Sequence, residues 1–481
     1  MGEAAVKFSI EGELPSEEFS LKKVFGAGAA LMIRQVIVQF LGAVTGIILA
    51  RSLSPADFGY YAIFTFGFYA LLAPGDLGLG AGLVRQDTEP KTSECRNVQF
   101  VRQLVDLVLL IVIWSASPWL ARIYGMSAQG ETAVRLLALA IFVQSFQVVP
   151  MVLMERALRF NSIALIEVAQ TLVYSVLVVY LALSGWGIVS FSLAWLAFSL
   201  TGAILANILS PWPLGWNFSL KFLRDRLPFC LPYQASGAVT LGKDAVTPVL
   251  IGIVLGATQV GYVNWAQMLA MIAALAVGVL HRVCFSAFAR IRSDKKRLGE
   301  MVEMSLRLSH LFVALPSVFI LFYSESITTL IFGAKWLAAL PIFAALWPAN
   351  FLVPTLPPLI AALNSLGRSG RVLAISVALT ALFWAAAALL IVQLGVYGYP
   401  PAFLLYYVSS LSFARELRKC GVSFSVFRAA FPVWVAAFAV VLAVVILDTM
   451  FGAPSAILLG VAFITAGILY LGVLFALNLY L

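Results

Sequence analysis

Long apolar runs separated by short polar stretches extend along almost the whole chain. A helix of about 20 apolar residues crosses the hydrocarbon core of a bilayer, and about fourteen runs reach that length. Two runs are weak, because 397–413 is short and Pro74 and Gly75 interrupt 59–82. The pattern predicts an all-α polytopic membrane protein with crossings near 24–50, 59–82, 98–120, 133–154, 162–184, 186–209, 231–256, 261–282, 307–331, 338–363, 371–393, 397–413, 429–448 and 454–479.

Lysines and arginines are distributed unevenly among the loops between these runs. Cytoplasmic loops of membrane proteins are enriched in both residues. If the N-terminus lies inside, most of the 31 basic residues fall in cytoplasmic segments. The exceptions are Arg51, Arg122, Arg135 and Lys335 in outer loops, and Arg34 and Lys243 within crossings. Because the number of crossings is even, this segregation predicts that both termini are cytoplasmic.

The composition agrees with a membrane protein and excludes a soluble enzyme. Hydrophobic residues make up 62% of the 481 residues, charged residues make up 11%, and the mean hydropathy is +0.99. A soluble domain carries about 25% charged residues. The net charge of +9 follows the cytoplasmic loops, so we expect no nucleic-acid partner. The four cysteines have no C-x-x-C spacing and no P-loop or metal-ligand motif occurs, so we expect neither a cofactor nor a metal.

An internal repeat relates the two halves of the chain. LSPADFGYYAI, which begins at Leu53, matches LGATQVGYVNW, which begins at Leu255. The glycines of the two segments, Gly59 and Gly261, are separated by the same 202 positions. Six crossings lie in each copy, so both copies enter the membrane from the same side and form a parallel repeat. Two such bundles can enclose a central cavity that opens alternately to each side, which is the geometry of a transporter.

The repeat divides the chain into five parts. We expect two six-helix lobes around the cavity, followed by two additional helices. The predicted parts are a cytoplasmic tail (1–23), an N-lobe of helices 1–6 (24–209), a cytoplasmic linker (210–230), a C-lobe of helices 7–12 (231–413) and the C-terminal helices 13 and 14 (414–481).

Three segments resemble those of a known family. They are ILARSLSPADFGYYAIF (48–64), DLGLGAGLVRQ (76–86) and MERALRFNSIALIEV (154–168). In these segments the chain resembles Wzx-type polysaccharide flippases of the multidrug/oligosaccharidyl-lipid/polysaccharide exporter superfamily. The resemblance implies a multi-pass protein of the bacterial inner membrane. It also implies that an undecaprenyl-diphosphate-linked oligosaccharide moves from the cytoplasmic to the outer leaflet by alternating access.

Charged residues within the crossings are the first candidates for substrate contact. A charge in the hydrocarbon region costs at least about 2.5 kcal/mol, so it usually faces a wet cavity or a partner. Arg34 lies in the middle of the first crossing, and Lys243 with Asp244 lies in the seventh, its counterpart in the repeat. We expect Arg34 and Lys243 to bind the diphosphate, although pairing with Asp244 is an alternative for either. Asp244 and Asp76 are candidates for ion coupling, with a counter-ion role or helix packing as their respective alternatives.

Other candidates lie at the cytoplasmic mouth and in helices 7 and 8. Arg282 and Arg307 flank the most basic loop, where they attract an anionic lipid or simply retain the loop inside. The amides Gln234, Asn264 and Gln267 suit glycan hydroxyls, or hold helices together. No role is assigned to Asp106, Glu167, Glu325 or Asp448, which are near helix ends.

Two other functions compete with a flippase. A multidrug or cation antiporter of the same superfamily requires an acidic cavity, against which Arg34 and Lys243 argue. An oligosaccharide polymerase or ligase requires a sizeable outer loop, and the outer loops are short, so we expect a transporter rather than an enzyme. The expected partners are the lipid-linked glycan, membrane lipids, a proton or sodium counter-ion, and polysaccharide polymerase or export machinery.

Overall fold

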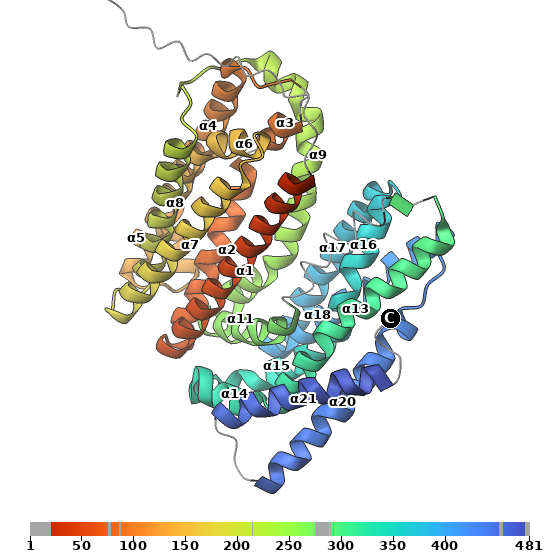
Figure 1. The fold of residues 1–481 in the computed structure, drawn as a ribbon. Coiled ribbons are helices and arrows are strands. Elements are labelled where there is room, and N and C mark those ends of the chain that lie inside the picture. Colours follow the sequence, from red (N-terminus) through yellow and green to blue (C-terminus); the bar gives the residue numbers. More distant parts are fainter. Residues whose placement is uncertain are drawn as a thin grey trace, which may run out of the picture.

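The protein is helical throughout the part of the chain that the structure describes. This computed structural model describes residues 21–75, 78–85, 88–213, 215–274, 288, 290–291, 293–451 and 456–476. Its helices form two neighbouring groups, which we call the N-lobe and the C-lobe, and a C-terminal pair follows them (Figure 1).

The N-lobe packs its helices side by side. α7 contacts both α1 and α8, and α5 contacts both α4 and α8. A short 3₁₀ turn, η1 (Ser145–Gln147), joins α5 to α6. The helices of this lobe are α1 (Leu21–Ser52), α2 (Pro55–Gly75), α3 (Leu79–Arg85), α4 (Thr92–Ile123), α5 (Ala128–Gln144), α6 (Val148–Arg156), α7 (Phe160–Leu183) and α8 (Val189–Leu209).

The C-lobe is more interrupted than the N-lobe. Its first helix begins at Leu220, inside the segment expected to be a linker. Wide π-helical turns form η2 (Val246–Ile251) and η4 (Thr328–Phe332), and 3₁₀ turns form η3 (Ile272–Ala274), η5 (Ala334–Ala339), η6 (Trp347–Phe351), η7 (Val353–Thr355) and η8 (Gly395–Gly398). The α-helices are α9 (Leu220–Asp244), α10 (Gly252–Leu255), α11 (Ala257–Met271), α13 (Lys295–Phe322), α14 (Ser324–Ile327), α15 (Leu340–Leu346), α16 (Leu356–Ser365), α17 (Ser369–Leu394), α18 (Tyr399–Ser409) and α19 (Ser412–Lys419).

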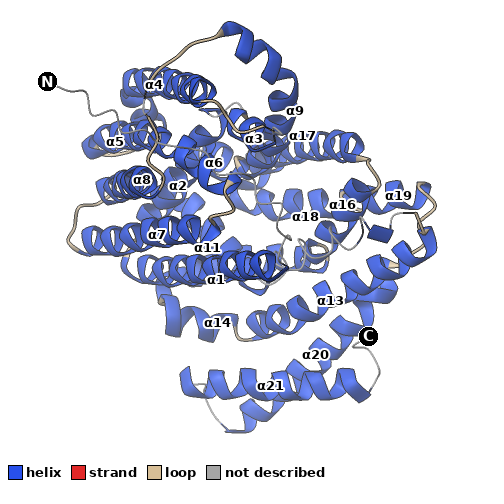
Figure 2. Cartoon of the chain, turned by 45° about the horizontal axis from the view of Figure 1, so that its top comes forward, coloured by secondary structure: helices blue, strands red, loops and turns tan. Residues whose placement is uncertain are grey.

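The last two helices pack on the C-lobe. α20 (Val426–Phe451) contacts α13 along its length, and α21 (Ala456–Ala476) packs on both, as the two ribbon views agree (Figure 2). The buried His310 of α13 accepts the indole N–H of Trp434 at 3.0 Å through Nδ1, so its Nε2 carries the proton and donates to Thr355 Oγ1 at 3.2 Å. His310 thus links α20 both to its own helix, α13, and through Thr355 to η7.

Each predicted crossing corresponds to a helical segment. Twelve described helical segments are long and apolar enough to cross a membrane. One of these, Ser369–Lys419, contains two of the predicted crossings. The predicted crossing at 261–282 begins as α11, and most of its remainder lies outside the described residues.

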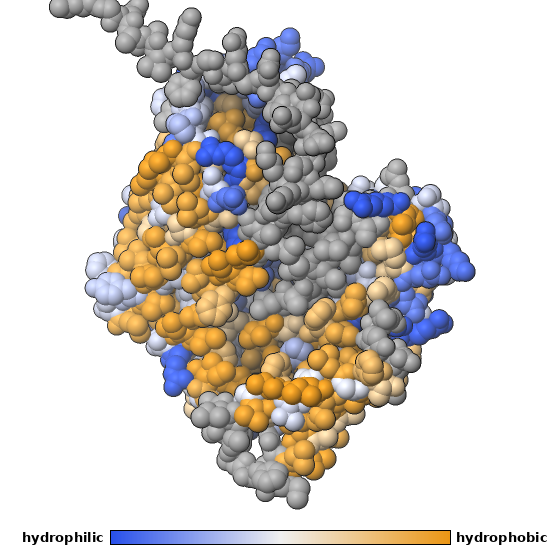
Figure 3. All heavy atoms as spheres, viewed as in Figure 1, coloured by the Kyte–Doolittle hydropathy of each residue, from blue (hydrophilic) through white to orange (hydrophobic). Residues whose placement is uncertain are grey.

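Large apolar side chains cover the outside of the molecule, as a membrane protein requires. Phe40, Val176, Val392 and Ile468 are more than 60% exposed. In Figure 3 the hydrophobic residues form a broad band, with hydrophilic residues mainly at its edges. In water such a surface would be unfavourable, whereas lipid tails cover it without cost.

The two lobes meet at the repeated glycines. A Cβ atom on Gly59 of α2 would lie closer than 3.0 Å to the carbonyl oxygen of Ala257, and one on Gly261 of α11 would crowd that of Pro55 in the same way. Pro55 and Ala257 are also separated by 202 positions, so the contact is symmetric with respect to the repeat. Only glycine permits so close an approach of two helix backbones.

Candidate functional site

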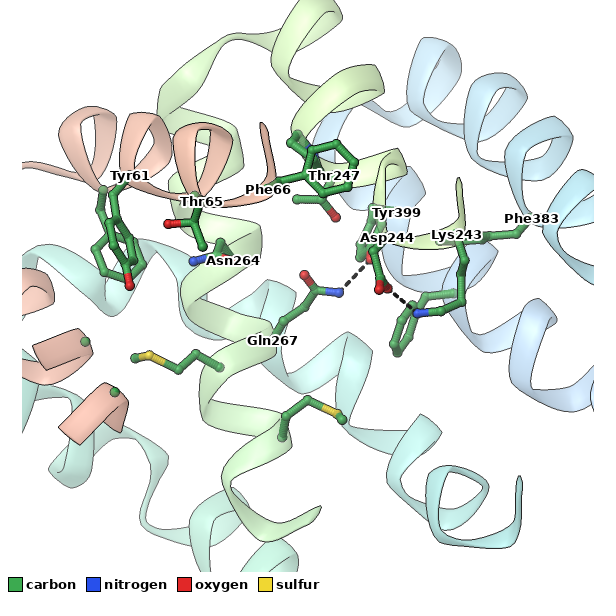
Figure 4. A pocket seen from close by; sticks show the side chains of 18 of the residues that line it. Tyr61, Thr65, Phe66, Lys243, Asp244, Thr247, Asn264, Gln267, Phe383 and Tyr399 are labelled. Carbon is green, nitrogen blue, oxygen red and sulfur yellow. Dashed lines mark hydrogen bonds and ion pairs between the residues drawn. The ribbon is translucent and has the colours of Figure 1, made fainter. Parts of the chain in front are cut away.

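A pocket of about 470 Å³ lies between the two lobes. Helices α1 and α2 supply its wall on the N-lobe side, and α9, η2, α11, α17 and α18 supply the C-lobe side (Figure 4). The lining residues are Gly42, Gly46, Phe58, Tyr61, Ala62, Thr65, Phe66, Lys243, Asp244, Thr247, Pro248, Asn264, Gln267, Met268, Met271, Phe383, Tyr399, Phe403 and Tyr407. Seven of these residues are aromatic, and the polar ones combine hydroxyl groups, two side-chain amides and one Lys–Asp pair.

The depth of the pocket follows from the order of residues along α2 and α11. In α2 the glycine contact at Gly59 precedes the lining residue Thr65 by six positions, which is about 9 Å of helix. In α11 the contact at Gly261 likewise precedes Gln267. With the predicted orientation both helices run from the outer face inward, so the glycine contact closes the outer side of the pocket.

Lys243 and Asp244 lie where the α-helical geometry of α9 ends. The next helical turns are π-helical, and they contain Pro248, whose missing N–H cannot bond back to the carbonyl of Asp244. Such wide turns are frequent at functional sites. They place both side chains at the pocket (Figure 4), where the Lys243 ammonium is paired with the Asp244 carboxylate.

The pair is partly open to the pocket. The Asp244 side chain is 51% exposed and that of Lys243 is 21% exposed. The Lys243 nitrogen also lies 5.9 Å from the ring centroid of Tyr406, within the range of a cation–π contact. Since these two are the charged residues of the described lining, the lining is neutral as a whole.

Two of the three predicted amides lie on the same wall. Gln267 donates its Nε2 hydrogen to the hydroxyl oxygen of Tyr399 at 2.6 Å. Asn264 lies one turn along α11 toward the outer contact and also lines the pocket. In Figure 4 the side chains of Gln267, Tyr399 and Asp244 point toward one another. The side chain of Gln234 lies outside the part that the structure describes.

Arg34 lies away from the pocket and has a partner of its own. Its guanidinium pairs with Glu167 of α7, for which the sequence alone suggests no role, and donates to Gln35 Oε1 at 2.8 Å. Successive residues of a helix are rotated by about 100°, so Gln35, Gln39, Gly42 and Gly46 lie within about 60° on one face of α1. The last two line the pocket. The face of α1 that carries Gln35, beside the Arg34 pair, and Gln39 therefore continues to the pocket at Gly42 and Gly46.

A second charged pair is fully buried in the N-lobe. Arg102 Nε lies 2.6 Å from a carboxylate oxygen of Asp106, and their side chains are 3% and 0% exposed. Arg102 also donates to the carbonyl oxygen of Leu72 at 3.1 Å, near the C-terminal end of α2. Arg102 is one of the basic residues that the charge distribution assigns to cytoplasmic segments, whereas its side chain is buried among helices. The spacing of four residues on one helix was the available signal.

Of the remaining candidates, Arg307 is not among the residues that line the pocket. Arg307 lies half-buried near the middle of α13. Arg282 and Asp76 lie outside the described residues.

A family model described as "Polysaccharide biosynthesis protein" matches residues 48–341 of this chain. The teichuronic acid biosynthesis protein TuaB of Bacillus subtilis (strain 168) is 24% identical over 295 residues, which are 56% of each chain. The chain thus spans little more than half the length of this relative. The succinoglycan biosynthesis transport protein ExoT of Rhizobium meliloti (strain 1021) is 24% identical over 80% of this chain and 76% of its own.

Solved structures share the fold at low sequence identity. The lipid II flippase MurJ in an inward closed conformation superposes with a TM-score of 0.76 at 14% identity, covering 93% of this chain and 97% of its own. An inward-facing multidrug resistance MATE family transporter of the MOP superfamily gives 0.62 at 16% identity, covering 82% and 98%. The described helices therefore have the fold of these transporters.

Proposed function

Because this chain belongs to the polysaccharide biosynthesis protein family, we propose that it is a flippase for a lipid-linked oligosaccharide. The substrate is a glycan on undecaprenyl diphosphate, carried from the cytoplasmic to the outer leaflet of a bacterial inner membrane. The observation that carries this proposal is the polar, aromatic-lined pocket between two repeated lobes that touch beyond its outer side. Alternating separation of the two lobes exposes such a pocket to each leaflet in turn.

The pocket chemistry suits the polar headgroup of this substrate. Its volume is within the usual range of about 300–1,000 Å³ for small-ligand sites, which is enough for a few sugar or phosphate units. Aromatic faces stack on the C–H surfaces of sugars, and the amides of Asn264 and Gln267 bond their hydroxyls. The lipid tail stays in the membrane beside the apolar outer surface.

Several charged residues have proposed roles in transport. Lys243 leaves Asp244 and binds a phosphate of the headgroup. Arg34 exchanges its bonds to Glu167 for bonds to the headgroup, which it guides along the face of α1 that carries Gln35 and Gln39. Arg282 and Arg307 attract the anionic lipid at the cytoplasmic mouth. Asp244 and Asp76 are the candidates for coupling to a proton or sodium ion.

The proposed partners follow from the proposed substrate. They are the lipid-linked glycan, the surrounding membrane lipids and the polymerase or export machinery that receives the glycan outside. Transport of this kind makes and breaks no covalent bond, so no catalytic residue is assigned and the chain acts as a transporter rather than an enzyme.

A multidrug or cation antiporter is the second candidate function. The neutrality of the described lining removes the objection that Lys243 raises against it, because the Lys243–Asp244 pair selects neither cations nor anions until one partner is displaced. An oligosaccharide polymerase or ligase has less support, since the described outer loops are short.

Reconstituted flipping distinguishes these functions. The full chain is placed in proteoliposomes with a fluorescent undecaprenyl-diphosphate oligosaccharide, and an impermeant reductant quenches the label in the exposed leaflet. Quenching of more than half of the label is expected with the protein, and about half without it. Half quenching with folded protein, together with uptake of a cationic dye, would favour the antiporter.

A further inference from the structure

The outer ends of the two lobes are joined by bonds that run in both directions. Arg51, in the last turn of α1, donates from one guanidinium nitrogen to the carbonyl oxygens of Leu330 at 2.7 Å and Ile331 at 3.0 Å. Both acceptors lie in η4, and the helical segment that contains η4 ends at Gly333. The last carbonyls of a helix have no partner within it and carry a partial negative charge, so a cation is a favourable partner.

The C-lobe in turn supplies hydrogen-bond donors to the end of α1. Lys335 of η5 donates to the carbonyl oxygen of Arg51 at 2.8 Å and to that of Leu53. The indole N–H of the neighbouring Trp336 donates to the carbonyl oxygen of Ala50 at 2.8 Å. Ala50 and Arg51 belong to the last turn of α1, and Leu53 directly follows this helix. Each lobe therefore supplies a cation that binds a helix end of the other lobe.

These bonds lie directly beside the pocket. Phe58 lines the pocket, and its ring meets that of Trp336 edge to face with centroids 5.2 Å apart. Trp336 also stacks on Trp265 of α11 at 5.4 Å. Phe58 is adjacent in sequence to Gly59, at the contact between α2 and α11. Headgroup release to the outer side therefore requires these contacts to separate.

We propose that Arg51, Lys335 and Trp336 form a latch that sets the balance between the inward-open and outward-open states. This inference rests on the proposed transport function. The latch joins cations to neutral carbonyls, and the described carboxylates form no ion pair with Arg51 or Lys335. Each bond of this kind contributes only about 1.5–3 kcal/mol, which is about one to two powers of ten in an equilibrium constant, so the latch can open in every transport cycle.

Side-specific labelling of the pocket tests the latch. Thr65→Cys places a thiol in the pocket, and an impermeant maleimide is added to the outside of cells or to inverted membrane vesicles. The chain without this substitution gives the background. In the parent, labelling from the cytoplasmic side is expected to dominate. In R51A/K335A the ratio of outer to inner labelling is expected to rise by about tenfold or more, because each lost charged hydrogen bond is worth about a factor of ten.

Two controls make the result specific to the latch. R51K/K335R retains both cations and is expected to stay near the parent ratio. Arg122→Ala removes an exposed arginine at the outer end of α4 that takes no part in the latch, and it is expected to change nothing.

The labelling result is independent of the transported substrate. An unchanged ratio in R51A/K335A, or a rise in labelling from both sides that signals loosened folding, would overturn the latch. If the flipping assay fails while R51A/K335A still raises the ratio of outer to inner labelling, the proposed function is overturned and the latch is supported.

Discussion

Gly59 of α2 and Gly261 of α11 let two repeated helices cross in backbone contact, each facing the first turn of the other. The two glycines are equivalent in the repeat, so the contact lies on the axis that relates the two lobes. Packing at an axis of this kind is self-complementary: the same small residue serves both sides.

Gly59→Val is expected to reduce export at least about tenfold. A valine side chain at the crossing of α2 and α11 pushes the two lobes apart by more than the hydrogen bonds between them can span. Complementation of a deletion strain, with immunoblots of membrane abundance, measures the effect. Gly460→Ala on α21 is the control, since a Cβ there meets open space. Normal export by both Gly59→Val and Gly261→Val would show that the crossing is not needed for transport.

Lys243→Ala is expected to abolish export while membrane abundance stays normal. The substitution removes the phosphate-binding cation and leaves the Asp244 carboxylate alone at the pocket, where it repels an anionic headgroup. Lys243→Arg keeps the charge and is expected to retain part of the activity. Surface polysaccharide is measured in each strain, and undiminished polysaccharide with Lys243→Ala would remove Lys243 from the mechanism.

Arg34 and Glu167 are expected to act as a pair in transport. Arg34→Ala is expected to reduce export at least about tenfold, since Glu167 then stays charged and unpaired near the path to the pocket. A double-mutant cycle separates the roles: Glu167→Gln alone is expected to be milder, because Arg34 stays free to bind phosphate. Equal losses for both single variants, with full recovery in the charge-swapped R34E/E167R, would identify the pair as structural.

Arg102→Ala is expected to destabilise the protein by about 3–5 kcal/mol, because it breaks a charged pair whose two side chains are both buried. Thermal unfolding in detergent, followed by loss of the monodisperse peak, measures the shift. The Arg135–Glu131 pair has the same spacing on α5 but is about one third exposed, so Glu131→Ala is expected to cost about 0.5 kcal/mol or less. Similar shifts for the two variants would contradict the role of burial.

Much of the fold was predictable because lipid imposes a simple rule on the sequence. A crossing needs a long apolar run, so the helical segments could be located one by one, including the appended α20 and α21. The repeat could be recognised because both copies retain the glycine. Lys243 was singled out because a charge in such a run is rare.

The crossings, the excess of cations in alternate loops and the repeat of the two halves can all be read from the order of residues in the chain. Tertiary structure alone decided which residues meet across separate helices. It paired Arg34 with Glu167, placed Arg51 and Lys335 on each other's helix ends and brought Gln267 to Tyr399. The physical reason is that hydrophobic runs are local properties of the chain. The partner of a polar side chain instead depends on the rotation and depth of a helix distant in sequence, which packing sets.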